Sequence, residues 1–305
     1  MKKGKMMLVM VIVLVSVLTL GIVGCEVEED PDVDPEPVDV EGEFDQIIGI
    51  DPGAGIMSST EEAIDVYDLE LDLLEGSDAA MTAELSTAIE QEEWIVVTGW
   101  TPHWKFAEWD LKFLEDPELV YGEEEYIANI GRPGLADDMP EVHEFLENFQ
   151  WGDEEIGEVM EMNADVEDFL GNAHTWIEQN EDLVDEWTPE GFGEGVDGDE
   201  VYISMVEWDC ATASTYVAAA VLENAGYEVD VTPVDAGVMW SSTYAGDADF
   251  FVCAWLPGTH EDYYDEYGDE IDEIATHYEG ARIGLVVPEY VGIDSITEIN
   301  DHIAQ

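Results

Sequence analysis

The feature that most constrains the fold is an alternation of short apolar strands with amphipathic helices, which begins near residue 45. A strand at 47–50 leads through the turn Asp51-Pro52-Gly53-Ala54-Gly55 into a helix expected over 58–69, with Ser59 and Glu62 as a capping box. Strands alternating with helices predict an α/β fold with a parallel sheet. The other expected strands are 94–98, 201–206, 229–234, 249–254 and 283–287, the helix 211–224 follows the second of them, and 115–195 is expected to be mainly helical.

The charge balance limits the possible partners. The 305 residues include 76 acidic and only 7 basic ones, for a net charge of −69. Nucleic acid is excluded because phosphate binding needs a basic surface, and a polybasic membrane patch is excluded for the same reason. Hydrophobic residues make up 46% of the chain, which a disordered acidic chain would lack. We interpret the acid excess as adaptation to high salt, where repulsion is screened. The alternative, calcium storage, lacks the expected loop spacing.

The N-terminus has the pattern of an export signal. Lys2, Lys3 and Lys5 precede an apolar run over 6–23, and Gly24 stands before Cys25. The pattern resembles a bacterial lipobox, which predicts a signal peptide at 1–25 and a lipidated Cys25 that anchors the chain outside the cytoplasm. An uncleaved membrane anchor is the alternative. Residues 26–44 are acidic and proline-rich, and predict a disordered linker.

Two features of the body could bind a small ligand. The turn through Gly55 and Ile56 opens a helix, where free backbone N–H groups favour an anion such as a carboxylate, although a plain tight turn is the alternative. Trp100, Trp208 and Trp255 each follow an expected strand, and could line one cleft beyond the carboxyl ends of the sheet. Aromatic faces attract quaternary ammonium groups, but core packing is the alternative for each tryptophan.

The sequence allows more than one role for the histidines and the cysteines. His260 follows the strand at 249–254 and could donate a hydrogen bond to a carboxylate, although a lone surface histidine is the alternative; His103 is a lesser candidate. Cys210 and Cys253 could form a disulfide or remain buried thiols. Nucleophile-elbow, P-loop and zinc-protease motifs are missing from the sequence, so catalytic residues, metal sites and cofactors are not expected.

These residues together resemble the glycine betaine/proline betaine substrate-binding proteins of ABC-type osmoprotectant importers. The matching stretches are IIGIDPGAGIMSSTEEAI (47–64), VVTGWTPHWKFAEWDLKFLEDP (96–117), VEWDCATASTYVAAAVLENAGYEV (206–229), VTPVDAGVMW (231–240), DADFFVCAWLPGTH (247–260) and IGLVVPEYVGIDSI (283–296). The resemblance implies a two-lobed periplasmic-binding-protein-like (type II) fold with the ligand between the lobes. It also implies the permease of an ABC transporter as partner, glycine betaine or a similar betaine as ligand, and no enzymatic activity.

The resemblance also implies roles for particular residues. Trp100, Trp208 and Trp255 would form an aromatic cage for a trimethylammonium group, with Trp104 as the alternative to the first. The carboxylate would bind the backbone N–H groups of Gly55 and Ile56 and the His260 side chain. Choline or carnitine is the alternative ligand, and a secreted α/β hydrolase the alternative from another class.

The order of the segments is that of a circularly permuted form of the family. The C-terminal SITEINDHIAQ reads as if it should continue into FDQIIGIDPGAG. Termini that lie close together tolerate such a permutation. One lobe would then comprise 45–112 plus 283–305, and the other 113–282.

Overall fold

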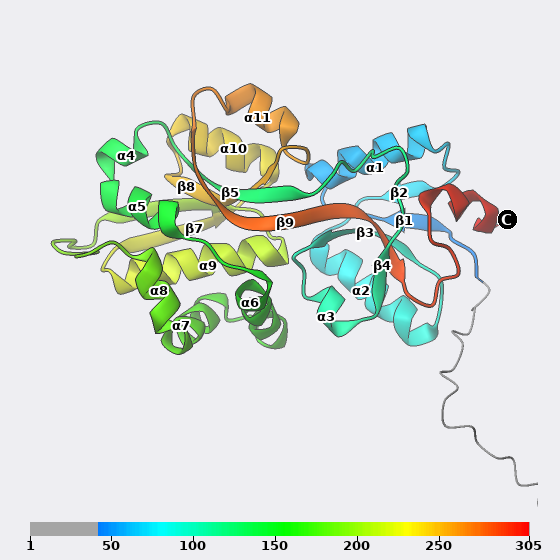
Figure 1. Ribbon diagram of the computed structural model, residues 1–305, viewed down its shortest axis with the longest axis horizontal. Helices are drawn as coiled ribbons and strands as arrows, with labels where there is room; N and C mark the ends of the chain where they lie inside the picture. The colour runs from blue at the N-terminus through cyan, green and yellow to red at the C-terminus, as the bar shows by residue number, and fades with distance from the viewer. Residues whose placement is uncertain (1–41, 305) are drawn as a thin grey trace, which may run out of the picture. The chain divides into compact units, whose positions relative to one another are not determined.

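The computed structural model describes residues 42–304 (Figure 1). The expected signal peptide, the lipidated Cys25 and nearly all of the expected linker lie outside the described residues. Within residues 42–304 no helix combines the length and the apolar character that crossing a membrane requires.

The strands form one mixed sheet in the order β2-β1-β3-β9-β5-β8-β6-β7, with β4 pairing to β9 at the side. Their bounds are β1 Gln46–Ile48, β2 Asp72–Leu74, β3 Val96–Thr101, β4 Leu111–Phe113, β5 Glu125–Gly131, β6 Glu200–Met205, β7 Glu228–Pro233, β8 Phe250–Leu256 and β9 Asp272–Pro288. Pairs β1–β2, β1–β3, β6–β7 and β6–β8 are parallel, as expected. The expectation of a parallel sheet is nevertheless wrong for β9 and β5, which pair antiparallel to their neighbours.

Strand β9 divides the sheet into two groups. Its residues 282–288 pair with β3 and β4, and its residues 272–281 pair with β5. We name β1–β4 with 282–288 lobe A, and β5–β8 with 272–281 lobe B. The strand was expected only over 283–287, because register shifts against β5 break the alternation of its first half. Strand β5 was also missed, since it lies in a stretch whose pattern is helical.

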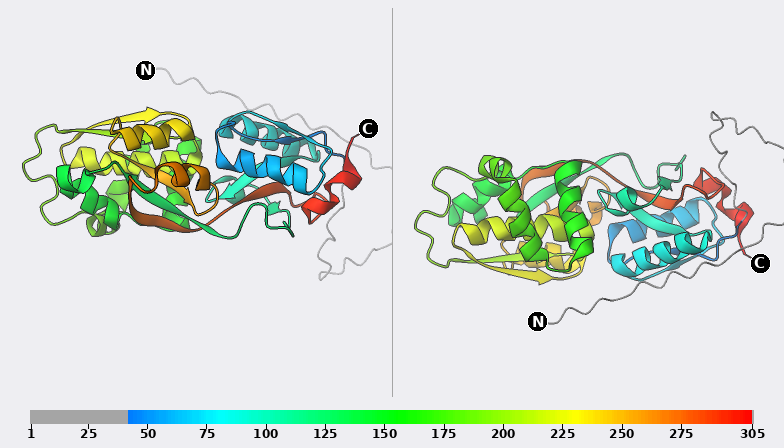
Figure 2. Two further views of the ribbon diagram at one scale, coloured as in Figure 1. Left: turned by 90° about the horizontal axis from the view of Figure 1, so that it is seen from above. Right: turned by 90° about the horizontal axis from the view of Figure 1, so that it is seen from below.

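Helices cover both faces of each group (Figures 1 and 2). In lobe A, α1 lies on one face and α2 with α3 on the other, and in lobe B α10 and α11 lie opposite α9. The helix bounds are α1 Gly55–Val66, α2 Asp78–Gln91, α3 Lys105–Glu108, α4 Leu135–Asp138, α5 Pro140–Asn148, α6 Asp153–Asp165, α7 Phe169–Gln179, α8 Glu181–Trp187, α9 Asp209–Asn224, α10 Ala236–Ala245, α11 Glu261–Tyr267 and the 3-10 helix η1 Ile296–His302. The mainly helical stretch expected around 115–195 therefore holds four-residue α4 and helices α5 to α8, besides β5.

The start of α1 differs from the expectation in a way that matters for the site. The helix begins at Gly55, three residues before the expected start, and Ala54 is its N-cap with no side-chain hydrogen bond. The predicted capping box is wrong, because Ser59 already lies inside the helix and donates to the carbonyl oxygen of Gly55 at 3.3 Å. The first turn of α1 therefore keeps N–H groups that no side-chain cap satisfies.

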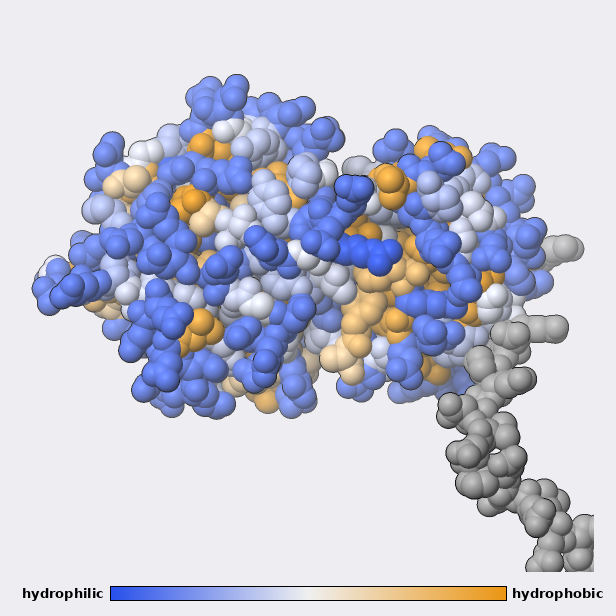
Figure 3. Space-filling view, in the orientation of Figure 1, coloured by the Kyte–Doolittle hydropathy of each residue, from blue (hydrophilic) through white to orange (hydrophobic). Residues whose placement is uncertain are grey.

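The ends of the described chain lie side by side. Phe44 forms a parallel bridge with Ile303, and its backbone N–H donates to the carbonyl oxygen of His302 at 2.7 Å. This adjacency is the condition under which a circular permutation leaves a fold intact. The face of the molecule drawn in Figure 3 is mostly hydrophilic, as the acid excess predicts.

Candidate functional site

Three of the predicted site tryptophans line a single cavity between the lobes. Trp100 ends the buried part of β3, Trp208 is the N-cap of α9 and lies three residues beyond the end of β6, and Trp255 lies near the end of β8. Each is at most 5% exposed. The centre of a water-sized sphere can occupy about 20 Å³ of this cavity, and its other lining residues are Ile50, Ala54, Ile56, Thr259 and Ile283.

The rings come from different strand ends but lie near one another. The centroids of Trp100 and Trp208 are 6.5 Å apart, with their planes at 54°. The Trp208 indole N–H donates to Asp51 at 3.1 Å, which fixes that ring against the turn before α1. Among the described residues, the indole N–H groups of Trp100 and Trp255 have no hydrogen-bond partner. The walls of the cavity are thus aromatic faces and aliphatic side chains.

Trp104, the alternative to Trp100, lies elsewhere. Its indole N–H donates to the Asp209 carboxylate, and its ring packs 5.4 Å from that of Trp109. Both rings line surface hollows beside α6 rather than the cavity. The structure therefore places Trp100, not Trp104, at the cavity.

The N-terminus of α1 reaches the same cavity. Ala54 and Ile56 line it directly, while Gly55 packs against the backbone of Thr259 from lobe B. The first N–H groups of a helix have no acceptor within the helix, and they carry the positive end of its dipole. No acidic side chain lies in the first turn of α1 to neutralise it. This end of the cavity is therefore suited to a negative group.

His260 lies beside the cavity, completely buried, rather than on a surface loop. The Trp255 backbone N–H donates to its Nδ1 at 3.1 Å, so Nδ1 carries no proton and the neutral ring has its N–H at Nε2. Nε2 has no partner among the described residues. Burial lowers the pKa of His260 to about 3, which keeps the ring neutral. Its ring centroid is 5.8 Å from that of Trp208.

Sequence reasoning missed Thr259 and what holds it. Glu125 of β5 accepts from the Gly258 and Thr259 backbone N–H groups at 2.8 and 2.6 Å, and from the Thr259 hydroxyl at 2.6 Å. These bonds hold the loop after β8 on β5, within lobe B. Thr259 adjoins the predicted His260, but no pattern in the sequence links it to a glutamate 134 residues away.

The cysteine question is settled by the structure. Cys210 and Cys253 are both free and buried. A hydrogen bond with the Cys253 thiol, together with burial, raises the pKa of Cys210, so this thiol stays neutral and packs as part of the apolar core.

Two α/β lobes that enclose a small apolar cavity define a fold that binds a small ligand between its lobes. The comparisons agree. Residues 31–179 and 199–305 match the family described as the substrate-binding domain of the ABC-type glycine betaine transport system. The chain belongs to this family, and the two-lobed binding-protein fold expected from the sequence is confirmed.

The glycine betaine/carnitine transport binding protein GbuC of Listeria monocytogenes is 44% identical over 257 residues, which cover 83% of this chain and 85% of that protein. Two solved structures are also similar. Lactococcal OpuAC with glycine betaine has 31% identity over 50% of this chain, at a TM-score of 0.43. ProX of Borrelia burgdorferi has 33% identity over 48%, also at 0.43. The matches span 61% and 56% of those two chains.

Family membership establishes the general function of the chain. The chain is the substrate-binding component of an ABC-type transport system, and such components act outside the cytoplasm. The expectation that it is not an enzyme is confirmed on the same ground.

Proposed function

We propose that this protein captures glycine betaine and delivers it to the permease of an ABC importer. The observation that carries the proposal is that aromatic faces from both lobes and the uncapped N-terminus of α1 meet at one cavity. Glycine betaine has a trimethylammonium group at one end and a carboxylate at the other. The cavity offers a complementary surface to each end.

The cationic end would lie among Trp100, Trp208 and Trp255. A cation over a desolvated indole face contributes about 0.5–2 kcal/mol per contact. Micromolar binding requires about 8 kcal/mol, so the three faces would supply a substantial part of it. Buried contacts of this kind are screened by salt less than exposed ion pairs are.

The carboxylate end would lie at the N-terminus of α1. There the backbone N–H groups of Gly55 and Ile56 are the available donors, and the helix dipole adds to their attraction. The Nε2–H of His260 is a further donor that is buried and without a partner among the described residues. Hydrogen bonds to an ionised carboxylate are roughly twice as strong as neutral ones.

Ligand binding would favour closure of the lobes. Gly55, Ile56 and Trp100 belong to lobe A, and Trp208, Trp255 and His260 to lobe B, so only the closed arrangement gives the ligand both sets of contacts. The chain would be held at the membrane by a lipid on Cys25. The acid excess would keep it hydrated in the saline medium where an osmolyte is most needed.

Calorimetric titration of residues 26–305 with glycine betaine, carnitine and choline in molar salt tests the proposal. Micromolar or tighter binding of betaine, with weak binding of choline, supports both the cage and the carboxylate site. Carnitine, whose charged groups lie farther apart, measures how much room the cavity provides. Absence of heat with all three ligands, for a protein shown by circular dichroism to be folded, contradicts the proposal.

A further inference from the structure

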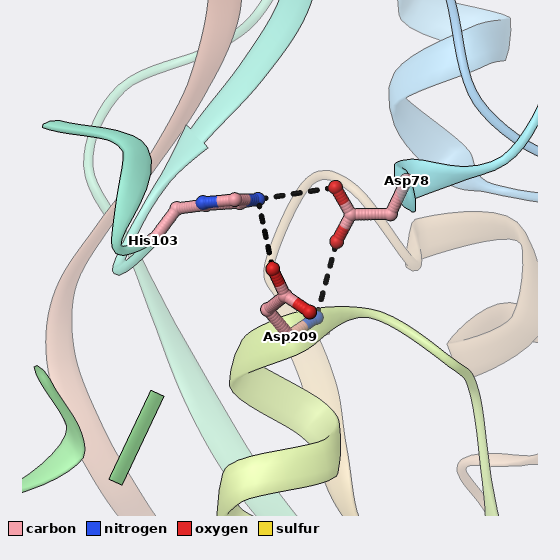
Figure 4. Close-up of side chains that lie close together, drawn as sticks. All are labelled: Asp78, His103 and Asp209. Carbon is pink, nitrogen blue, oxygen red and sulfur yellow. Dashed lines mark hydrogen bonds and ion pairs between the residues drawn. The ribbon is translucent and has the colours of Figure 1, made fainter. Parts of the chain in front are cut away.

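A buried carboxylate lies behind two walls of the cavity. Asp78 is the first residue of α2 and is 2% exposed. Its Oδ1 lies 3.1 Å from Nε2 of His103, and its Oδ2 accepts the backbone N–H of Asp209 at 3.1 Å (Figure 4). One side chain of lobe A thus joins the loop after β3 to the first turn of α9 in lobe B.

Asp78 accepts from His103, from the backbone of Asp209 and, at 3.3 Å to its Oδ1, from the Thr82 hydroxyl. The backbone N–H of Lys105 donates to Nδ1 of His103 at 3.1 Å, so the neutral ring carries its proton at Nε2 and donates it to Asp78. The N–H of Asp209 can only donate. An ionised carboxylate presents acceptors alone and satisfies all of these donors, whereas an amide of the same shape has one acceptor and would turn its NH₂ toward His103 or Asp209.

Each partner adjoins a cavity tryptophan. The His103 ring packs edge-on against Trp100, with centroids 5.0 Å apart. Asp209 directly follows Trp208, and its carboxylate accepts from the indole of Trp104. The hydrogen bonds from His103 and Asp209 to Asp78 therefore hold the segment bearing Trp100 and the segment bearing Trp208 at a set separation.

The trio Asp78, His103 and Asp209 also has the spacing of a metal site. Two observations oppose this reading. The His103 nitrogen that faces the carboxylates is the one that bears the proton, so it has no lone pair for a metal. In addition, the buried ammonium of Lys105, whose pKa burial lowers only to about 8, lies 4.0 Å from the centroid of the Trp100 ring and already supplies a positive charge there.

We propose that Asp78 is a positioning residue for ligand binding, which sets the spacing of the two cavity walls by tying the Trp100 segment of lobe A to the Trp208 segment of lobe B. The identity of the ligand in this inference rests on the proposed function, whereas the hydrogen bonds of Asp78 do not depend on it. Asp78 does not touch the cavity, so its effect on binding passes through the two tryptophans.

Asp78→Asn is the direct test, with Asp168→Asn as the matched control. Asp168 is the N-cap of α7, where its carboxylate accepts only a local N–H, from Gly171. Asp78→Asn should weaken betaine binding about 10- to 100-fold, mainly by faster dissociation, because a hydrogen bond to the charged group is replaced by opposed donors. Asp168→Asn should leave the dissociation constant unchanged. Equal affinities of Asp78→Asn and the wild type would overturn the inference.

Two His103 variants provide a second test in case Asp78→Asn does not fold. His103→Gln keeps a hydrogen-bond donor toward Asp78 and should retain much of the affinity for betaine. His103→Leu has no such donor and should lose that affinity, even at a thermal stability comparable with that of His103→Gln. Equal affinities for these two variants would overturn the inference. Chelation by EDTA should have no effect on the wild type; a loss of affinity equal to that of Asp78→Asn would show a metal site instead.

A ligand-free readout separates this inference from the proposed function. If the wild type binds no betaine, the proposed function fails, and the indole N–H signals in nuclear magnetic resonance spectra decide about Asp78. Asp78→Asn should shift the Trp100 and Trp208 signals and leave those of Trp176 and Trp187 in place. Unshifted Trp100 and Trp208 signals would overturn the inference.

Discussion

Gly55 and Thr259 meet backbone to backbone across the two lobes. A Cβ built on Gly55 would lie 1.8 Å from the carbonyl oxygen of Thr259, far closer than two non-bonded heavy atoms can approach. Gly55 begins α1, and Thr259 lies on the loop that Glu125 holds. The absence of a side chain at Gly55 is therefore what lets the N-terminus of α1 approach lobe B and close one end of the cavity.

Gly55→Ala should abolish tight betaine binding while leaving each lobe folded, because the added methyl group keeps the lobes apart. Gly53→Ala is the control, since a Cβ there would meet its nearest neighbour at 3.9 Å. Calorimetry should show a loss of at least about tenfold for Gly55→Ala, as expected when the closed state is disfavoured by more than about 1.4 kcal/mol. Similar affinities for the two variants would show that this contact does not limit closure.

Trp100→Ala should raise the dissociation constant for betaine about 3- to 30-fold, the equivalent of one cation–π contact, and Trp100→Phe should raise it less because a ring face remains. Trp109→Ala is the control, because Trp109 packs on Trp104 outside the cavity. Titration of the three variants with betaine shows whether Trp100 contacts the ligand or only packs in the core. A loss of affinity in Trp109→Ala as large as that in Trp100→Ala would argue for a general packing effect.

His260→Ala should weaken betaine binding about 10- to 100-fold, the range for a hydrogen bond to a charged group, and should barely change binding of choline, which has no carboxylate. Because the pKa of His260 is lowered to about 3, its Nε2–H donor should persist unchanged from pH 5 to pH 8. His143→Ala, on α5, serves as the control. Unaltered betaine affinity in His260→Ala would remove this residue from the site.

Two neighbouring groups should make opposite contributions to stability in acid. Burial, with the Asp78 charge nearby, raises the pKa of Asp209 from 3.8 to about 6, so the stability linked to it is greatest below pH 3.8 and is lost as pH rises through 6. Burial, with the Lys105 charge, lowers the pKa of His103 from 6.5 to about 4, so the stability linked to it is full above pH 6.5 and is lost as pH falls through 4.

The two contributions oppose each other between about pH 4 and pH 6 and should partly cancel in the wild type. In Asp209→Asn only the histidine term remains, and the free energy of unfolding should fall more steeply on acidification than in the wild type. In His103→Gln it should fall less steeply. Urea unfolding of the three proteins at several pH values measures the differences. Parallel curves would show that neither group titrates as its surroundings suggest.

The melting temperature should rise by about 5 °C or more between roughly 0.1 and 2 M salt, because the Debye length shrinks from about 10 Å to less than 3 Å and the self-repulsion of the acidic surface is screened. Sodium and potassium chloride should act alike, since screening depends on ionic strength. Thermal melts in both salts provide the measurement. A melting temperature that is highest at low salt would contradict adaptation to a saline medium.

The sequence determined the local elements and the chemical character of the site. Apolar runs and glycine turns located β1, β3, β6 and β8 to within a few residues, because hydrophobic periodicity directly reflects which backbone face is buried. The same reading located the tryptophans at strand ends. It missed β5 and the first half of β9, because those segments become strands only by pairing with each other across register shifts that leave no regular alternation.

The tertiary structure decided everything that depends on distant contacts. Whether Trp100 or Trp104 lines the cavity depends on which ring faces the other lobe. The two residues are four positions apart and follow the same strand, so the sequence does not separate them. The burial of His260, with its free Nε2–H, follows from the Trp255 backbone that fixes its tautomer. Asp78 is one acid among 76 in the sequence, and only the approach of Asp209, 131 residues away, distinguishes it. Such relationships depend on how the lobes pack, which no local pattern records.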